Sequence, residues 1–226
     1  MSRTALVTGG NRGLGFEICR QICRRGLQVV LTARRLEDAR AAAARLREEG
    51  LTVHPWELDV TVPEAAPVLA RQLAAEGVHA DVLVNNAGIF RDGAILDVDL
   101  QLVRESFEVH LFGPLSLIRA FAPGMRERGY GRIVNVCSGY GQISQGLKGS
   151  AASYNLSKAA LGALTLRLSV ELPATVKVNA ALPGWLSNRG GPVSMEAGAD
   201  TVVWLATLPD DGPSGGLFRE RRPAEW

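Results

Sequence analysis

The chain has 226 residues, 46% of them apolar, and its 25 basic residues are interleaved with 23 acidic ones to give a net charge of +2 at pH 7. This length predicts one domain with a substantial core, and the balanced charge offers no basic surface for nucleic acid. Apolar stretches fall short of the roughly 20 residues that cross a bilayer, and the N-terminus lacks a secretory signal pattern, so we expect a cytoplasmic protein with no membrane partner.

Apolar, β-rich runs alternate with helical patterns along the chain. Strands are predicted at Thr4–Thr8, Gln28–Ala33, Thr52–Leu58, Val82–Asn85, Arg132–Val136, Val176–Ala181 and Leu217–Arg219. Helices are predicted at Leu14–Arg25, Glu37–Glu49, Glu64–Glu76, Asp99–Arg128, Ala152–Glu171 and Met195–Leu208. Because parallel neighbours need crossover connections, this alternation predicts an α/β fold over residues 1–226, a doubly wound parallel sheet with helices on both faces. An irregular, glycine-containing stretch near 185–195 is predicted to form a substrate flap.

The cysteines and histidines are not grouped as metal ligands usually are. Cys19, Cys23 and Cys137 are odd in number, and the three histidines are scattered along the chain. We therefore expect reduced, mostly buried thiols and no metal site.

A glycine-rich turn directly follows the first predicted strand. It reads Thr8-Gly9-Gly10-Asn11-Arg12-Gly13-Leu14-Gly15 and opens into a helix. Glycines permit a tight turn and let backbone N–H groups approach a pyrophosphate, which the positive end of the helix stabilises. The turn predicts a Rossmann-type dinucleotide site whose cofactor-binding residues are Gly9, Asn11, Arg12, Gly13, Leu14 and Gly15.

The end of the second predicted strand indicates which dinucleotide is bound. Enzymes that prefer NAD usually place an acidic residue there for the ribose hydroxyls, but the strand is followed by Arg34 and Arg35, and the first carboxylate is Glu37. Arg34 suits a 2′-phosphate, and Arg12 lies on the same side of the adenosine pocket. This predicts NADPH/NADP+ rather than NADH. The alternative is that both arginines are ordinary solvated charges.

Polar residues of the second half of the chain form a catalytic pattern. Tyr154 and Lys158 fall one turn apart on the same face of a predicted helix. Ser138 follows the fifth predicted strand, at the edge of the sheet where ligands bind in this class of fold.

In this order, the glycine turn, Asn85-Asn86-Ala87-Gly88, Ser138, Tyr154 and Lys158 resemble the short-chain dehydrogenase/reductase family, close to its carbonyl-reductase members. The resemblance extends from Thr4 to the C-terminus. It implies that Tyr154 gives a proton to the substrate's carbonyl oxygen as hydride arrives at carbon, while Ser138 holds that oxygen. It also implies that Lys158 stabilises the tyrosine phenolate and binds the nicotinamide ribose.

The same resemblance implies further contacts with the cofactor. Asp59 and Val60 would flank the adenine, and Asn86, Ala87 and Gly88 would wall the cofactor, although Asn86 is equally compatible with a structural turn. Pro183 and Gly184 would lie beneath the nicotinamide, with the backbone from Trp185 onward holding the carboxamide. Small residues at positions 87 and 88 allow a ligand to approach closely.

Two positions depart from the family pattern. His110 occupies the place of an asparagine that holds a relay water, and three outcomes are open: it replaces the asparagine in the relay, the relay is slow, or the pocket has turned to other chemistry. After Trp185, the family's usual threonine is missing, and Ser187 or Asn188 are candidates for its hydrogen bond.

These features predict an NADPH-dependent oxidoreductase that reduces a ketone or aldehyde of a small molecule to an alcohol. The alternative is a non-redox or narrowly specific family member, an isomerase or nucleotide sensor that uses the same pocket. The helices at Asp99–Arg128 and Ala152–Glu171 carry apolar surface that pairs across a two-fold axis in many members of the family that the chain resembles. The resemblance therefore implies a homodimer or homotetramer.

Overall fold

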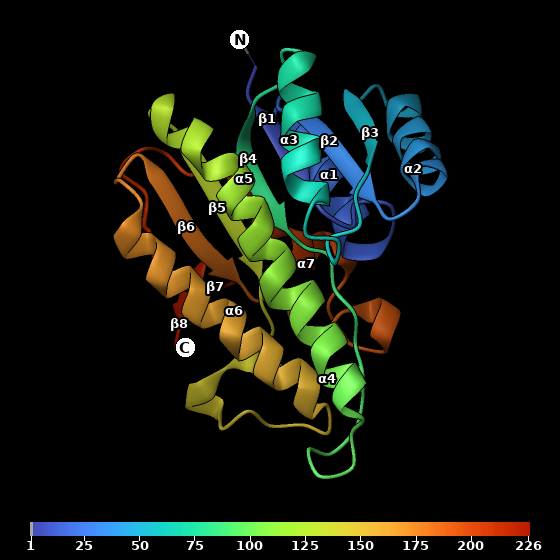
Figure 1. The fold of residues 1–226 in the computed structure, drawn as a ribbon, viewed down its shortest axis with the longest axis vertical. Coiled ribbons are helices and arrows are strands. Elements are labelled where there is room, and N and C mark those ends of the chain that lie inside the picture. The colour runs from blue at the N-terminus through green and yellow to red at the C-terminus, as the bar shows by residue number, and fades with distance from the viewer. Residues whose placement is uncertain (1) are drawn as a thin grey trace.

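Within residues 2–226, which the computed structural model describes, eight strands form one sheet in the order β3-β2-β1-β4-β5-β6-β7-β8. The strands are β1 Thr4–Val7, β2 Gln28–Ala33, β3 Val53–Glu57, β4 Ala80–Asn85, β5 Gly131–Val136, β6 Val176–Ala181, β7 Leu217–Arg219 and β8 Arg222–Ala224. Neighbours pair in parallel until β8, which is antiparallel to β7. This order confirms the predicted doubly wound, Rossmann-type fold (Figure 1).

Helices cover both faces of the sheet. They are α1 Gly13–Arg24, α2 Leu36–Glu48, α3 Ala65–Ala75, α4 Leu100–Phe107, α5 Gly113–Glu127, α6 Ala152–Glu171 and α7 Met195–Ala206, with the short turns η1 Glu108–Phe112, η2 Gly139–Gly141, η3 Ile143–Gln145 and η4 Ser187–Arg189. Side chains of α1, α2 and α7 share one apolar core with the sheet, and those of α3, α5 and α6 share another. Figure 1 shows α3, α5 and α6 in front of the sheet and α7 behind it.

The first strand shows why a central strand of this sheet is apolar on both faces. Successive side chains of a strand point to opposite faces, and both faces here carry helices. Ala5 and Val7 therefore enter the core beneath α1 and α7, while Leu6 enters the core beneath α3 and α5. A strand that is buried on both faces has no position for a solvated polar residue.

The helix predicted at Asp99–Arg128 is interrupted. It consists of α4, the π-helical turn η1 and α5, and Pro114 lies in the first turn of α5. Proline has no N–H, so it cannot donate to the carbonyl four residues earlier, and a wider turn accommodates the lost bond. The break lies at His110, at the position where the sequence departs from the family pattern.

The last strand, β8, was not predicted from the sequence. It pairs with β7 through a turn in which Glu220 and Arg221 have φ values of +50° and +59°. Such tight hairpin turns usually carry asparagine or glycine at these positions. Two charged residues give no such signal, so local sequence did not indicate the hairpin.

The carboxyl ends of the central strands and the loops that follow them define the candidate site. The arrowheads of β4 and β6 point toward the lower half of Figure 1, where the loops 86–99 and 137–151 lie. Backbone bonds join these loops, because Gly93 N–H donates to Ser150 O at 2.9 Å and Ala152 N–H donates to Gly93 O at 3.1 Å. No helix within the described residues combines the length and the apolar composition that crossing a bilayer requires.

Candidate active site

The glycine turn between β1 and α1 forms a cradle, a concave stretch of backbone in which a side chain on Gly15 would clash. Gly9 has φ +63°, and a Cβ on Gly15 would lie 2.1 Å from the Gly9 carbonyl oxygen. Arg12 is extended at the start of α1, and no side chain of the described residues caps the first turn of this helix. Its N–H groups are thus available to an anionic group.

The remaining residues of the turn have different surroundings. Asn11 and Gly13 are half-buried in the turn. Leu14 is buried, and its side chain belongs to the core that α1 shares with the sheet. Only the backbone of Leu14 therefore remains to contact a cofactor.

Asn86 fastens the glycine turn to the end of β4. Its side-chain N–H₂ donates to Thr8 O at 2.8 Å and to Gly9 O at 3.2 Å. The Thr8 hydroxyl oxygen accepts the backbone N–H groups of Asn86 and Ala87 at 3.0 and 2.9 Å. The Asn86 amide thus holds the turn, which is the structural role that the sequence left open for this residue. The small Ala87 and Gly88 leave room beside it.

Arg12 and Arg34 are exposed arginines whose charges both act on Asp38 in α2. Hydrogen bonding from Arg35 lowers the pKa of Asp38 most, and the charges of Arg12 and Arg34 lower it further. Arg35 is engaged with Asp38 at 2.8 Å, whereas neither Arg12 nor Arg34 forms an ion pair with any described residue. Two exposed guanidinium groups that act on the same carboxylate suit a phosphate group.

The loop after β3 is fixed against α5. Asp59 Oδ1 accepts from the N–H and the hydroxyl of Thr61, at 2.9 and 2.7 Å. A Cβ on Gly113 would lie 2.7 Å from the Val60 carbonyl oxygen, so this glycine allows α5 to approach the loop. Asp59 and Val60 are thereby held near the carboxyl end of β3, where the resemblance placed the adenine.

The three predicted catalytic residues converge at the carboxyl end of β5. Tyr154 lies in the first turn of α6, and Ser138 is the second residue after β5. Lys158 is 4% exposed, donates from Nζ to Val136 O at 2.7 Å, and lies with Nζ 5.7 Å from the centre of the Tyr154 ring. A Cβ on Gly141 would lie 2.7 Å from Lys158 Cβ, so glycine there lets the segment after Ser138 run against α6.

Burial shifts the pKa values of both titratable members of this group. Burial raises the pKa of Tyr154, while a hydrogen bond with the Ser138 side chain and the charge of Arg189 lower it. Burial lowers the pKa of Lys158 to about 8. At pH 7 the tyrosine therefore carries its proton and the lysine is charged, which are the states that a proton donor and a phenolate stabiliser require.

His110 is a buried, neutral bridge between the loop after β4 and the helix α6. Its side chain is 0% exposed, Nε2 accepts from Ile89 N–H at 3.1 Å, and Nδ1 lies 2.8 Å from Ser157 Oγ. Because Nε2 is an acceptor, Nδ1 carries the hydrogen and donates to Ser157, whose hydroxyl donates to Tyr154 O at 3.0 Å. The ring also packs edge-on against the Tyr154 ring at 5.3 Å between centroids.

Acid should destabilise the protein through His110. Burial lowers the pKa of His110 to about 2, well below the ordinary value of about 6.5 for histidine. The unfolded chain therefore takes up a proton below pH 6.5 that the folded chain refuses, so stability present above that pH is lost as the pH falls. We expect wild type to lose about 3 kcal/mol more unfolding free energy than His110→Asn between pH 7 and 4.5.

Urea unfolding at several pH values measures this difference, because all other titrating groups are common to the two proteins. Parallel pH dependences for wild type and variant would show instead that His110 is protonated within the fold.

The flap closes on itself. Val193 N–H donates to Trp185 O at 3.0 Å, Ser187 N–H donates to Val193 O at 2.7 Å, and Trp185 Nε1 donates to Arg189 O at 3.0 Å. Gly184, with φ +84°, turns the chain from Pro183 into this loop. Trp185 itself is 65% exposed.

Two residues of the site were missed by sequence reasoning. Phe90 stacks beside Tyr154, with ring centroids 5.1 Å apart, and beside Tyr140 at 6.2 Å. The Arg189 guanidinium lies over the Phe90 ring, 5.0 Å from its centroid. The only available signals were the position of Phe90 just after Gly88 and a charge within the flap.

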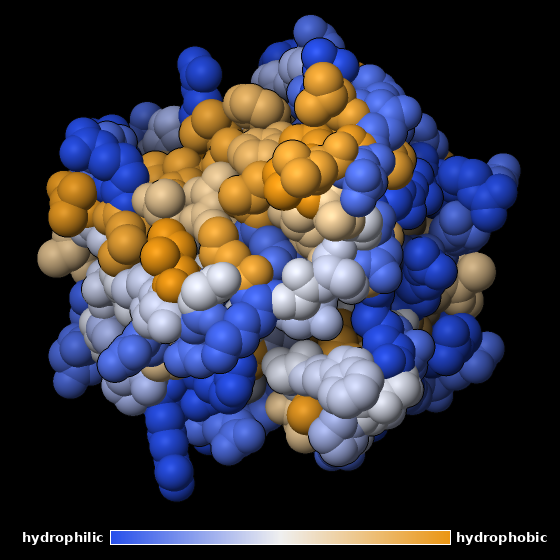
Figure 2. All heavy atoms as spheres, turned by 90° about the horizontal axis from the view of Figure 1, so that it is seen from below, coloured by the Kyte–Doolittle hydropathy of each residue, from blue (hydrophilic) through white to orange (hydrophobic). Residues whose placement is uncertain are grey.

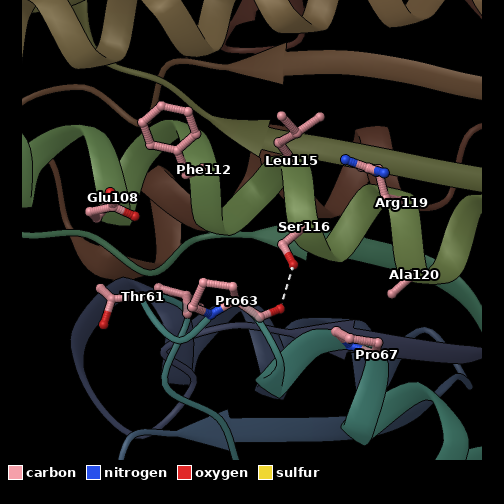
Figure 3. Close-up of a pocket in the computed structure, with 10 residues that line it drawn as sticks. Thr61, Pro63, Pro67, Glu108, Phe112, Leu115, Ser116, Arg119 and Ala120 are labelled. Atoms are coloured by element: carbon pink, nitrogen blue, oxygen red, sulfur yellow. Dashed lines mark hydrogen bonds between the residues drawn. The ribbon is translucent and has the colours of Figure 1, made fainter.

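One cavity of the described residues lies away from these side chains. It measures about 660 Å³ and is lined by Val60, Thr61, Pro63, Pro67, Glu108, Phe112, Leu115, Ser116, Arg119 and Ala120. Figure 3 shows it between the segment that enters α3 and the helix α5, bridged where Ser116 Oγ donates to Pro63 O at 3.2 Å. It contains none of the catalytic candidates, and Val60 is its one predicted cofactor residue.

Comparisons with known proteins agree with this geometry. A family model described as short chain dehydrogenase matches residues 3–190. The chain is 30% identical to (+)-neomenthol dehydrogenase of Arabidopsis thaliana, with 99% of this chain and 98% of the relative covered. It is 31% identical to carbonyl reductase (NADPH) 3 of Rattus norvegicus, with 100% and 99% covered.

Solved structures give the same likeness. The chain superposes on an NADPH-bound carbonyl reductase from chicken fatty liver with a TM-score of 0.87 and 26% identity, over 100% of this chain and 99% of that one. It superposes on a metagenomic short-chain oxidoreductase in complex with NADP with a TM-score of 0.83 and 32% identity, over 97% and 98% of the two chains.

Proposed function

The chain belongs to the short-chain dehydrogenase family, and from this premise we propose that it reduces a ketone or aldehyde of a small molecule with NADPH. One observation carries the proposal: Tyr154 lies one helical turn from the buried ammonium of Lys158, whose Nζ is 5.7 Å from the centre of the tyrosine ring, and Ser138 lies near enough to lower the pKa of the tyrosine. A phenol beside a hydroxyl and a cation is an arrangement for giving a proton to an oxygen that gains negative charge.

The residues of the first half of the chain fit NADPH. A Cβ on Gly15 would fill the cradle, the first turn of α1 has no side-chain cap within the described residues, and the charges of Arg34 and Arg12 act on the same carboxylate. Gly9, Gly13 and the backbone of Leu14 would hold the pyrophosphate, and the two arginines the 2′-phosphate. When bound, NADPH supplies the hydride. NADP-bound structures among the relatives support this choice.

Each catalytic side chain has one task in this proposal. Ser138 orients the carbonyl oxygen and donates a hydrogen bond as charge develops on it. The Tyr154 O–H bond breaks as an O–H bond forms on the substrate, which leaves a phenolate. Lys158, charged below its pKa of about 8, stabilises that phenolate.

We propose that His110 is a positioning residue in this site. It fixes Ile89 and Ser157 on either side of Tyr154 through a neutral ring. Its geometry gives no support to the non-redox alternative, because the ring is committed to protein partners and leaves the tyrosine, serine and lysine in place. The acid-stability comparison above tests its neutral state.

The test of the function is loss of NADPH absorbance with purified protein over a panel of aldehydes, ketones and quinones. We expect turnover of at least one carbonyl compound, faster with NADPH than with NADH. Tight NADPH binding without oxidation across the panel would contradict the reductase and favour the non-redox alternative.

Arg34 should determine the preference for NADPH. Removing a charge-assisted contact to the 2′-phosphate with Arg34→Ser should raise the KM for NADPH roughly 10- to 100-fold and leave the KM for NADH unchanged. Arg35→Ser is the matched control, because Arg35 is engaged with Asp38. Equal effects of the two variants, or an equal effect on both cofactors, would show that Arg34 is an ordinary surface charge.

We also propose that the chain forms a homodimer or homotetramer through α5 and α6. Leu156, Leu166 and Val170 of α6 are exposed, Val170 by 74%, and Figure 2 shows apolar side chains gathered over part of the end of the molecule seen there. Apolar surface of this kind favours self-association. Sedimentation equilibrium of wild type and Val170→Glu measures it, and a monomeric wild type would contradict it.

A further inference from the structure

An exposed guanidinium without an ion-pair partner among the described residues lies over the ring that packs beside Tyr154. Arg189 lies 5.0 Å over the Phe90 ring, whose centroid is 5.1 Å from that of Tyr154. The guanidinium is therefore within about 10 Å of the Tyr154 ring. In residues 2–226, none of the ion pairs involves Arg189.

The flap holds Arg189 in this place. Arg189 N–H donates to Leu186 O at 2.9 Å, and Arg189 O accepts from Trp185 Nε1 at 3.0 Å. Its neighbour Asn188 points the other way, since a Cβ on Gly13 would lie 3.3 Å from Asn188 Nδ2. Adjacent side chains of a 3-10 turn diverge. Asn188 therefore faces the glycine turn, and Arg189 faces Phe90.

The charges around the tyrosine are one-sided. Lys158 and Arg189 are both cationic, and no carboxylate of the described chain is among the groups whose charges shift the pKa of Tyr154, His110 or Lys158. A positive site bounded by the rings of Phe90 and Tyr140 complements a ligand with a flat or apolar middle and an anionic end.

We propose that the substrate of this reductase is an oxo acid: a small aldehyde or ketone whose carboxylate binds Arg189 while its carbonyl oxygen meets Tyr154 and Ser138. This inference rests on the proposed function and names its substrate class. Arg189 is the specificity-determining residue, because a guanidinium pairs with a carboxylate through two parallel hydrogen bonds. Phe90 and Tyr140 line the space between the two ends.

The test compares 4-carboxybenzaldehyde with its neutral methyl ester, methyl 4-formylbenzoate, in wild type, Arg189→Gln and Arg189→Lys. We expect wild type to prefer the acid in kcat/KM. We expect Arg189→Gln to lower the ratio of kcat/KM for the acid to kcat/KM for the ester roughly 10- to 100-fold and to leave NADPH binding unchanged. Arg189→Lys should restore part of the preference, since it keeps the charge without the planar fork.

Arg91→Gln is the control for a general change of surface charge, because this exposed arginine lies beside Phe90 but next to Glu105, at 3.9 Å. Equal losses for acid and ester in Arg189→Gln would overturn the inference, and so would weakened NADPH binding, which would assign the arginine to the cofactor.

A binding measurement separates the inference from the proposed function. Terephthalate, the dicarboxylate that has no aldehyde to reduce, is titrated into the NADP+-loaded protein, and its affinity is measured by calorimetry. Arg189-dependent binding of this acid without turnover of any carbonyl would contradict the reductase and leave the anion site standing. Turnover of both aldehydes that is unaffected by replacing Arg189 would support the reductase and contradict the anion site. Failure of both measurements would overturn both proposals.

Discussion

Replacing Tyr154 with phenylalanine should lower kcat/KM for carbonyl reduction by about 10³-fold, because the variant has no proton to give to the carbonyl oxygen. The change removes one oxygen atom from a ring that Phe90 and His110 hold in place, at 5.1 and 5.3 Å between centroids. The ring and the fold should therefore remain, and NADPH affinity should change less than about twofold.

Steady-state kinetics and fluorescence titration of NADPH measure the two quantities. Tyr130→Phe is the matched control, because this tyrosine lies beneath the guanidinium groups of Arg3 and Arg132, outside the site. A Tyr154→Phe enzyme that keeps most of its activity would remove the tyrosine from the mechanism. If the variant no longer binds NADPH, its loss of activity would reflect lost cofactor binding rather than the missing proton donor.

Adding one methyl group to the glycine cradle should disable cofactor binding. In Gly15→Ala the Cβ would lie 2.1 Å from Gly9 O and 2.5 Å from Asn86 Nδ2. The nearest atom belongs to the backbone of a turn that Asn86 holds on both sides, so it cannot move without opening the turn. We expect a loss of about 3 kcal/mol of unfolding free energy and a fall in NADPH affinity of roughly tenfold or more.

Gly26→Ala is the control for the general cost of replacing a glycine. Gly26 lies beyond the opposite end of α1, has φ +85°, and has open space around its Cβ position. It should cost about 1 kcal/mol of backbone strain and leave NADPH binding intact. Urea unfolding and NADPH titration of both variants compare them. Equal stabilities and affinities would show that the turn relaxes around the added methyl group.

Much of the fold and of the candidate site was predictable because it depends on local spacing. Tyr154 and Lys158 fall on one face of α6 by helical periodicity alone, and the glycine turn follows β1 by sequence order. Parallel strands bring their carboxyl ends to one edge, so the positions of Ser138 and Gly88 after β5 and β4 were sufficient to place them near the tyrosine.

Other features depend on residues that are distant in sequence. The state of His110 was open because a histidine titrates near neutral pH unless burial prevents it. The partners that settle its geometry, Ile89 and Ser157, lie 21 and 47 positions away. Likewise, no periodicity indicates that Arg189 lies over Phe90, since the approach of the flap to the loop after β4 depends on how the two loops fold.

The amino-acid sequence by itself determined the alternation of strands and helices, the phosphate turn, the cation at Arg34 and the identities of Tyr154, Ser138 and Lys158. Only the tertiary structure decided the neutral bridging geometry of His110, the break between α4 and α5, the hairpin of β8 and the cation above Phe90. The physical reason is the range of the interactions. Backbone periodicity and turn chemistry act over a few residues, whereas burial, charge and ring packing arise only when distant segments meet.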